Sequence, residues 1–258
     1  MSGVRFRLIC LFSQEGSPHL TSGDLLVIVP SRGRPRRLRE MITETRRLST
    51  ARTEIAVAVD DDDPELPAYE GIVAPLIGAG VRFAIGPRKT LAGWTNHVAG
   101  RHAGRYRCLA SLGDDHLPRT PGWDSLLLNA IDGMGGTGIA YPDDRRRADI
   151  PEAVAISSDI VLALGWFCEP SLQHFRVDDV WADLGNGAGC LRYVPGAVVE
   201  HLHYSVRPGV VRDGTYADAE DRAPADHAAY ERWRRERMAA DIETVRKLRE
   251  RPPQPPGR

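Results

Sequence analysis

The feature of this sequence that most constrains its fold is a series of short apolar runs that end in polar residues. The run LLVIVP (25–30) leads into the turn SRGRP, and EIAVAVD (54–60) leads into four consecutive aspartates, Asp60 to Asp63. Continuous apolar runs of this length are typical of strands that are buried on both faces. We therefore expect parallel strands whose carboxyl ends bring polar side chains to one edge of a sheet.

Helical patterns separate the apolar runs. In residues 35–48, Pro35 suits a first helical turn, and a buried face is predicted at helical spacing from Leu38, Met41, Ile42, Thr45 and Leu48. We also expect helices at about 66–79, 90–103, 120–131 and 177–186, and strands at 81–85, 105–113, 135–142 and 198–204. This alternation predicts an α/β fold with a Rossmann-like, mixed and mostly parallel sheet flanked by helices.

The composition fits one large domain with two peripheral segments. A chain of 258 residues with 42% hydrophobic residues can bury one substantial core. We expect a loosely ordered leader (1–23), a folded domain (24–223), and a charged helix followed by a Pro-rich tail (224–258). The tail RPPQPPGR cannot form a core of its own.

Charge and cysteine content limit the classes of protein to consider. The formal net charge of −1 argues against a protein that holds polyanions by bulk charge alone. The cysteines are far apart and form no C-x-x-C pair, which argues against a zinc ribbon or a disulfide framework. The apolar run near the amino terminus is too short for a signal peptide or a membrane span. We expect a cytoplasmic protein.

Asp60 to Asp63 form the first acidic turn at a predicted strand end. The turn can simply be a solvated loop before Pro64. At a strand terminus, however, Asp60 and Asp62 can accept hydrogen bonds from the ribose or base of a nucleotide. Four neighbouring carboxylates also repel one another unless a cationic group lies near. The position favours nucleotide contact.

Asp114 and Asp115 form the second acidic turn, after the strand LASLG. An Asp-rich turn without function is the alternative. Paired carboxylates suit Mg²⁺ or Mn²⁺ that bridges a diphosphate, because hard cations take oxygen ligands and keep substrate phosphates in their shell. His116 beside them is interpreted as a supporting or structural residue rather than as a ligand.

Two downstream pairs are also candidates. On the expected strand 198–204, His201 and His203 would face the same side and can complete a metal shell, although a structural surface pair is equally typical. Asp178 and Asp179 open an expected helix, where capping explains one of them. The other interpretation is a general base that deprotonates an acceptor hydroxyl.

Taken in order, the motifs resemble those of family 2-like GT-A glycosyltransferases, including compact stand-alone members of the kind found in phages. The motifs are VIVPSRGRP, VAVDDDDP, GPRKTLAGWTNHVAG, LASLGDDHLPRTPGWD, VDDVWADLG and VEHLHY, and the match covers residues 24 to 205. The resemblance implies a GT-A fold and transfer of a sugar from a nucleotide-sugar donor to an acceptor hydroxyl. It further implies a metal-dependent direct displacement with inversion.

The resemblance also implies a role for individual residues. Asp179 or Asp178 matches the acidic motif that supplies the base, and Asp115 with His201 or His203 matches the metal ligands for Mn²⁺ or Mg²⁺. Gly113 stands where the usual metal triplet has its first aspartate, so which of Asp114 and Asp115 binds metal stays open. The implied nucleotide-sugar contacts are Pro30, Ser31, Arg34, Asp60, Asp62, Lys89, Thr90, Asn96 and Asp114.

The acceptor is not fixed by these motifs. Some phage enzymes of this type act on hydroxymethylated bases in DNA, and arginine runs at 34–39, 145–147 and 232–237 can meet phosphates. The same arginines can equally be solvated helix faces, so a glycan or small molecule and a modified DNA are both retained as acceptors. Two other classes compete: a metal-dependent phosphohydrolase, and a non-catalytic module that binds a nucleotide sugar or DNA.

Overall fold

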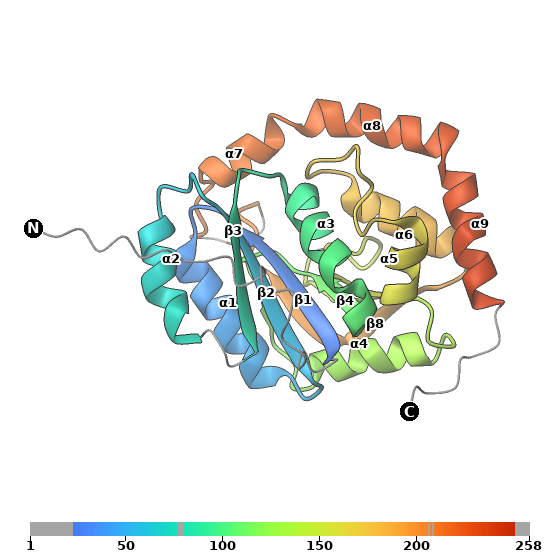
Figure 1. The fold of residues 1–258 in the computed structure, drawn as a ribbon, viewed down its shortest axis with the longest axis horizontal. Coiled ribbons are helices and arrows are strands. Elements are labelled where there is room, and N and C mark those ends of the chain that lie inside the picture. Colours follow the sequence, from blue (N-terminus) through green and yellow to red (C-terminus); the bar gives the residue numbers. More distant parts are fainter. Residues whose placement is uncertain (1–22, 77–79, 206, 208, 251–258) are drawn as a thin grey trace, which may run out of the picture.

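The central feature of the fold is a mixed sheet with helices on both faces (Figure 1). The structure is a computed structural model that describes residues 23–76, 80–205, 207 and 209–250. Within this part of the chain, eight strands form one sheet in the order β3-β2-β1-β4-β7-β6-β8-β5. The predicted α/β fold is confirmed. Of the expected leader, residues 1–22 lie outside the described residues, as does the tail from residue 251.

The first half of the sheet is parallel. The central strand β1 (Gly23–Ser31) pairs with β2 (Thr53–Asp60) on one side and with β4 (Tyr106–Ser111) on the other. β3 (Val81–Gly86) extends the sheet beyond β2. Because the chain passes from β1 to β2 and β3, and then returns to β4, the strand order reverses between β1 and β4. Open α/β sheets bind ligands beyond the carboxyl ends of strands at such a reversal.

The second half of the sheet is mixed. β7 (Val154–Ser157) runs antiparallel to β4 and to β6 (Ile139–Asp143), and β6 runs parallel to the long strand β8 (Leu191–His201). The short strand β5 (His116–Pro118) pairs antiparallel with the end of β8. This last pairing places His116 directly opposite His201.

The helices divide between the two faces of the sheet. Their bounds are α1 (Pro35–Leu48), α2 (Leu66–Val73), α3 (Leu91–His102), α4 (Trp123–Asp132), α5 (Ser158–Leu164), α6 (Val177–Gly187), α7 (Gly214–Glu220), α8 (Ala223–Glu236) and α9 (Met238–Arg249), with 3-10 turns at Ala74–Leu76 and Ala103–Arg105. The chain from α7 to α9 runs along one side of the molecule and reaches the helices that cover the second half of the sheet (Figure 1).

Two hydrophobic cores flank the sheet, as expected for strands buried on both faces. Leu26 and Ile28 of β1 contribute to the core that also contains α3 and α6, whereas Leu25, Val27 and Val29 contribute to the core under α1 and α4. The apolar face predicted for residues 35–48 is confirmed, because all of its predicted members are buried in α1.

The highly charged segment after residue 223 also takes part in a core. Trp233 of α8 is 2% exposed and Val245 of α9 is fully buried, and both belong to the core that contains α6. Only one stripe of each helix is apolar, and the arginines of α8 lie on the outer side. Cys108, Cys168 and Cys190 are buried free thiols. No helix of the described chain is long and apolar enough to cross a membrane.

The motif TPGWD, which contributed to the family resemblance, has a structural role. Gly122 adopts a positive φ of 73°, and Trp123 begins α4 as a fully buried core residue. Asp124 is fully buried and accepts hydrogen bonds from the backbone nitrogens of Thr50 and Ala51. It also accepts 2.6 Å and 2.8 Å bonds from Thr53 Oγ1 and from the backbone nitrogen of residue 125. Asp124 thus fixes the turn between α1 and β2 to the start of α4.

We predict that Asp124→Ala destabilises the protein strongly, because it leaves buried donors without an acceptor. The expected loss in free energy of unfolding is about 3 kcal/mol or more, measured by urea unfolding followed by circular dichroism. Asp132→Ala on the same helix is the matched control, because Asp132 is an exposed partner of Arg107 and such surface pairs contribute little. Equal losses in the two variants would contradict this assignment.

Candidate active site

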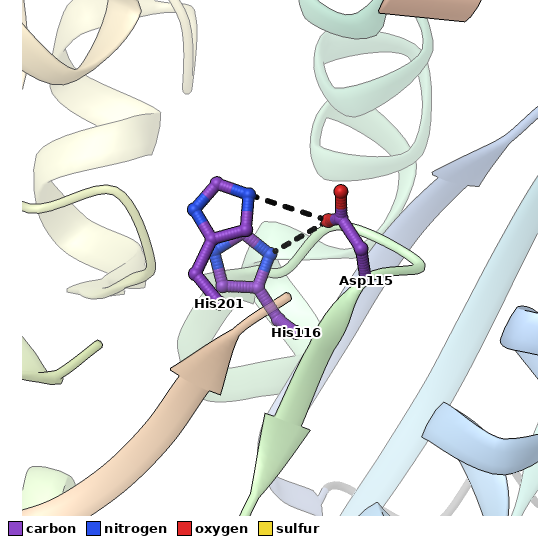
Figure 2. A group of neighbouring side chains, drawn as sticks. All are labelled: Asp115, His116 and His201. Carbon is purple, nitrogen blue, oxygen red and sulfur yellow. Dashed lines mark ion pairs between the residues drawn. The ribbon is translucent and has the colours of Figure 1, made fainter. Parts of the chain in front are cut away.

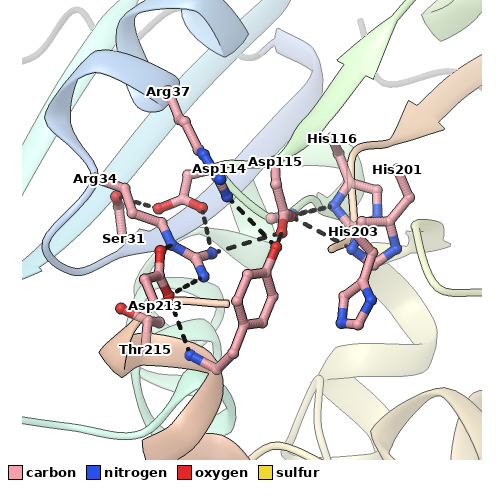
Figure 3. Close-up of polar contacts among 12 residues, drawn as sticks. Ser31, Arg34, Arg37, Asp114, Asp115, His116, His201, His203, Asp213 and Thr215 are labelled. Carbon is pink, nitrogen blue, oxygen red and sulfur yellow. Dashed lines mark hydrogen bonds and ion pairs between the residues drawn. The ribbon is translucent and has the colours of Figure 1, made fainter. Parts of the chain in front are cut away.

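The candidate site begins where the carboxyl ends of β1 and β4 meet. Ser31, the last residue of β1, donates a 2.6 Å hydrogen bond from Oγ to Oδ2 of Asp114, which follows β4. Ser31, Asp114 and Asp115 are all less than 10% exposed. The reversal in strand order therefore brings two buried carboxylates against the turn after β1, and Figure 3 shows the polar groups that surround them.

The two carboxylates face different partners. Asp114 contacts Ser31 and lies 3.2 Å from Nη1 of Arg34, whereas Asp115 turns its Oδ1 toward His116 and His201. Burial, together with the neighbouring charge of Asp115, raises the pKa of Asp114 to about 6 despite Arg34. Burial also acts to raise the pKa of Asp115, but contacts with the two histidines outweigh it and hold that pKa below its usual value. Asp115 is therefore the carboxylate that faces the two histidines.

Asp115, His116 and His201 form a group that can hold a metal ion. Oδ1 of Asp115 lies 3.4 Å from Nδ1 of His116 and 3.6 Å from Nε2 of His201 (Figure 2). Two ligand atoms bonded at about 2.1 Å in a tetrahedral site lie about 3.4 Å apart, which agrees with these separations. The donor atoms therefore fit a single divalent cation.

His116 belongs to this group, although the sequence suggested only a supporting role. Its Nδ1 accepts a 2.9 Å hydrogen bond from the backbone nitrogen of Gly113, and its ring stacks on that of His201 with centroids 4.1 Å apart. Its Nε2 is buried and has no hydrogen-bond partner among the described residues. Buried polar atoms such as Nε2 rarely lack a partner. The nitrogen that faces Asp115 is Nδ1, so a cation bound there would replace the hydrogen bond from Gly113.

Gly113 explains why the usual metal triplet is altered here. A Cβ atom at this position would lie 2.5 Å from Oδ1 of Asp115 and 2.7 Å from Nδ1 of His116. These are the atoms that face the candidate cation, so any side chain at position 113 would displace them. This close approach favours glycine at position 113.

His203 does not lie where the strand pattern placed it. β8 ends at His201, and the backbone nitrogen of Leu202 bonds to the carbonyl oxygen of Asp115 in the same register as the β5–β8 pairs. His203 lies two residues beyond this strand end and contacts Ser205 through Nδ1 at 2.7 Å. Its ring lies edge-on to that of His201, with centroids 5.3 Å apart, but it is outside the candidate metal group.

Residues 213 to 216, at the start of α7, cover the acidic pair. The hydroxyl of Tyr216 donates a 2.7 Å hydrogen bond to Oδ2 of Asp115, and the guanidinium of Arg34 lies 4.0 Å from the centre of the Tyr216 ring. Asp213 accepts two hydrogen bonds from Arg34. Asp213 and Tyr216 were not among the residues predicted from the sequence. The sequence around Asp213 indicates only a helix N-cap, and Asp213 does accept a hydrogen bond from the backbone nitrogen of Tyr216 as the N-cap of α7.

The first acidic turn is organised by an arginine. Asp60 accepts hydrogen bonds from the backbone nitrogen of Lys89, from Nε1 of Trp94 and from Nη1 of Arg32, and it is 3% exposed. The same Nη1 atom lies 2.6 Å from Oδ1 of the half-exposed Asp62. The turn therefore has the cationic neighbour that the run of aspartates required. Asp60 is a buried anchor, and Asp62 is the more accessible carboxylate.

The remaining predicted nucleotide contacts have distinct positions. Pro30 lies in β1 beside Ser31, and Thr90 caps α3 by accepting a hydrogen bond from the backbone nitrogen of Gly93. The ammonium of Lys89 lies over the Trp94 ring at 5.1 Å. The carboxamide of Asn96 bonds instead to the backbone of residues 167 and 168. It therefore holds that loop against α3.

Asp178 and Asp179 lie in the first turn of α6, as predicted, but in different surroundings. Asp179 lies 3.1 Å from Nη1 of Arg176, whereas Asp178 contacts only the backbone nitrogen of Asp179 in the described contacts. Burial, followed by the charge of Asp179 and a smaller effect of Glu152, raises the pKa of Asp178 to about 6. An Asp with a raised pKa is better matched to proton transfer near neutral pH.

The comparisons with known proteins agree on the fold. No protein-family model matches the sequence, and no curated protein sequence matches it either. A mannosyltransferase, PcManGT from Pyrobaculum calidifontis, solved with GDP-Man and Mn²⁺, is similar with a TM-score of 0.56 and 14% identity over 89% of this chain and 76% of that one.

A second similar structure is S. aureus TarS 1-349. Its complex with UDP-GlcNAc has a TM-score of 0.55 and 9% identity over 76% of this chain, and its complex with UDP has a TM-score of 0.55 and 7% identity over 68% of this chain. The present chain spans 64% and 59% of the TarS fragment in the two complexes. The chain has a GT-A glycosyltransferase fold, as its motifs implied.

We predict that His201→Ala weakens Mn²⁺ binding by about 100-fold or more, because even the outer partners of metal ligands typically contribute 10- to 100-fold. His203→Ala should retain wild-type affinity, since His203 lies outside the group that can hold the ion. Isothermal titration of the nucleotide-free protein with MnCl₂ measures both. Loss of Mn²⁺ binding in His203→Ala but not in His201→Ala would contradict the site as described.

Proposed function

We propose that this protein is a metal-dependent, inverting glycosyltransferase that moves a sugar from a nucleotide-sugar donor to an acceptor hydroxyl. The observation that carries the proposal is the Asp115, His116 and His201 group at the reversal of strand order in a GT-A fold. Ser31 and Asp114 border this group on the side of β1. A donor diphosphate bound there would lie between the cation and the turn after β1.

The donor set favours Mn²⁺ over Mg²⁺. Two imidazoles and one carboxylate suit a transition metal, whereas Mg²⁺ prefers oxygen ligands. PcManGT, which has the same fold, was solved with Mn²⁺ and GDP-Man. A cation held by Asp115, His116 and His201 would neutralise charge on the departing nucleoside diphosphate. Mn²⁺ or Mg²⁺ thus remains the proposed cofactor, with Mn²⁺ preferred.

The nucleotide is proposed to bind along the carboxyl ends of β1 and β2. Asp62 and Arg32 form an exposed polar pair that can bond to a base or ribose. The buried Asp60 holds Arg32 in place through a second ion pair. Ser31 and Arg34 contact Asp114, which lies next to Asp115 of the candidate metal group (Figure 3). The base of a bound nucleotide sugar can therefore contact the turn at Asp60 to Asp63, while its diphosphate contacts the turn at Asp114 and Asp115.

The general base is proposed to come from Asp178 or Asp179. Asp178 is the better candidate, because Asp179 already has a cationic partner in Arg176. In this mechanism the acceptor hydroxyl attacks the anomeric carbon from the face opposite the diphosphate, and the carboxylate accepts the hydroxyl proton as the new bond forms. Attack from the opposite face inverts the configuration at that carbon.

We predict that Asp178→Asn lowers kcat by roughly 10²- to 10⁴-fold, the usual contribution of a general base, while donor affinity is retained. Steady-state transfer assays and donor titration separate the two effects. Asp183→Asn is the matched control, because Asp183 lies on the same helix but bonds to the hydroxyl of Tyr230. A large loss in Asp179→Asn with little effect in Asp178→Asn would assign the base to Asp179.

We favour a glycan or small molecule over a modified DNA as the acceptor. Each arginine of the run 145–147 is paired with a carboxylate: Arg145 with Asp143, Arg146 with Glu152, and Arg147 with Asp149. Arg34 is likewise engaged by Asp114 and Asp213. These four arginines do not form an unneutralised surface for phosphates, which weakens their part in the case for a hydroxymethylated base in DNA.

We predict that one class of nucleotide sugar, tested among UDP-, GDP-, CDP- and dTDP-sugars, raises the unfolding temperature in the presence of Mn²⁺ and not with EDTA. Binding to the native state alone produces such a rise. A thermal-shift series measures it, and the same donor then enters transfer assays with candidate acceptors, including hydroxymethylated DNA. Equal consumption of donor with and without acceptor would favour a phosphohydrolase. Binding without turnover would favour a non-catalytic module.

A further inference from the structure

The loop between β6 and β7 contacts the imidazole nitrogen of His201 that does not face Asp115. Oε2 of Glu152 lies 2.7 Å from Nδ1 of His201, whereas Nε2 of the same ring faces Oδ1 of Asp115. The side chains of Glu152 and His201 are each 12% exposed. Glu152 is thus the only described carboxylate paired with Nδ1 of His201.

The hydrogen bond to Glu152 determines which ring nitrogen can bind a cation. An ionised carboxylate only accepts hydrogen bonds, so Nδ1 of His201 must carry the proton that the bond requires. The lone pair of the neutral ring then resides on Nε2, the nitrogen that faces Asp115. The orientation of the ring and the position of its proton both suit metal binding through Nε2.

The surrounding loop holds Glu152 in place. Nη1 of Arg146 lies 2.7 Å from Oε2 of Glu152, and the backbone nitrogen of His201 bonds to the carbonyl oxygen of Asp144 at 3.0 Å. Asp144 in turn accepts hydrogen bonds from the backbone nitrogens of Arg146 and Arg147. The loop is therefore bonded to the end of β8. Arg146, the central arginine of the run 145–147, has a structural role in this loop.

We propose that Glu152 is a positioning residue that fixes His201 for metal binding through Nε2. This proposal rests on the proposed metal-dependent function. Among the members of the metal group, His201 is the one that Glu152 contacts directly in the described structure. Outer carboxylates that accept a hydrogen bond from a ligating histidine orient the ring and increase its basicity.

The test compares Mn²⁺ affinity in nucleotide-free variants of the full chain. Glu152→Ala should bind Mn²⁺ about 10- to 100-fold more weakly than wild type, the usual effect of losing such a partner. Glu152→Gln should be affected less, because its carbonyl oxygen can still accept the hydrogen bond from Nδ1. Isothermal titration measures the affinities, and unfolding temperatures in EDTA establish that each variant is folded.

Glu200→Ala is the matched control. Glu200 precedes His201 in β8 and its side chain is also 12% exposed, but it pairs with Arg119 instead of His201. Its removal takes away the same charge at nearly the same place and should leave Mn²⁺ affinity near the wild-type value. A folded Glu152→Ala variant with wild-type affinity, or equal losses in Glu152→Ala and Glu200→Ala, would overturn the proposal.

A second measurement does not depend on the stability of a variant. Long-range ¹H–¹⁵N spectra of the wild-type protein loaded with diamagnetic Zn²⁺ should show His201 protonated at Nδ1 and bound to the ion through Nε2. Binding through Nδ1, or a wild-type protein that binds neither Mn²⁺ nor Zn²⁺, would refute the role of Glu152.

The two proposals can fail separately. If Mn²⁺ affinity falls in the order wild type, Glu152→Gln, Glu152→Ala but the wild type transfers no sugar from any donor, the positioning role stands and the transferase function fails. If the wild type is an active transferase whose Mn²⁺ affinity does not depend on Glu152, the function stands and the positioning role fails.

Discussion

The burial of neighbouring carboxylates at the strand ends is the constraint on which this site depends. Asp114 and Asp115 are adjacent and nearly inaccessible, and Asp60 is buried in the other acidic turn. Buried carboxylates are costly unless a countercharge or hydrogen-bond donor lies close. The turn after β1 supplies both countercharges: Arg32 pairs with the turn at Asp60, and Arg34 lies between Asp114 and Asp115.

This arrangement follows from the order of the strands. β1 lies between β2 and β4, so the turn that follows β1 lies between the acidic turns that follow its two neighbours. Arg34 is nearly buried and is held by Asp213 on one side and by the acidic pair on the other. The motif SRGRP is therefore the electrostatic centre of the site, and its two arginines serve different acidic turns.

The two carboxylate oxygens of Asp115 have different partners. One of its oxygens faces the two histidines, and the other accepts a hydrogen bond from Tyr216 and lies 3.5 Å from Arg34. A cation held by the candidate metal group would therefore bind one oxygen of this carboxylate, while the protein's own donors contact the other. Tyr216 holds the carboxylate plane while Oδ1 stays turned toward the imidazoles, as expected for a preorganised ligand.

The sequence predicted those parts of the fold and site that depend on local pattern. β1, α1 and the acidic strand ends follow from apolar runs and helical spacing, and their order was sufficient to indicate the fold. Contacts between distant residues left no such pattern: Tyr216 and Asp115 are 101 residues apart, and Glu152 and His201 are 49 apart. His203 was expected on one strand with His201, but β8 ends at His201 and His203 lies outside the candidate metal group.

The segment after residue 223 illustrates the same limit, because its high charge conceals a buried anchor. Asp226, in the first turn of α8, is fully buried and accepts hydrogen bonds from the backbone nitrogens of residues 173, 174 and 175. Those residues lead directly into the turn of α6 that carries Asp178. Because a buried carboxylate with three donors is held firmly, α8 fixes the backbone of the segment that precedes the proposed base. The charged residues of this helix therefore lie on its outer face, while its buried Asp226 fixes the segment that leads to the proposed base.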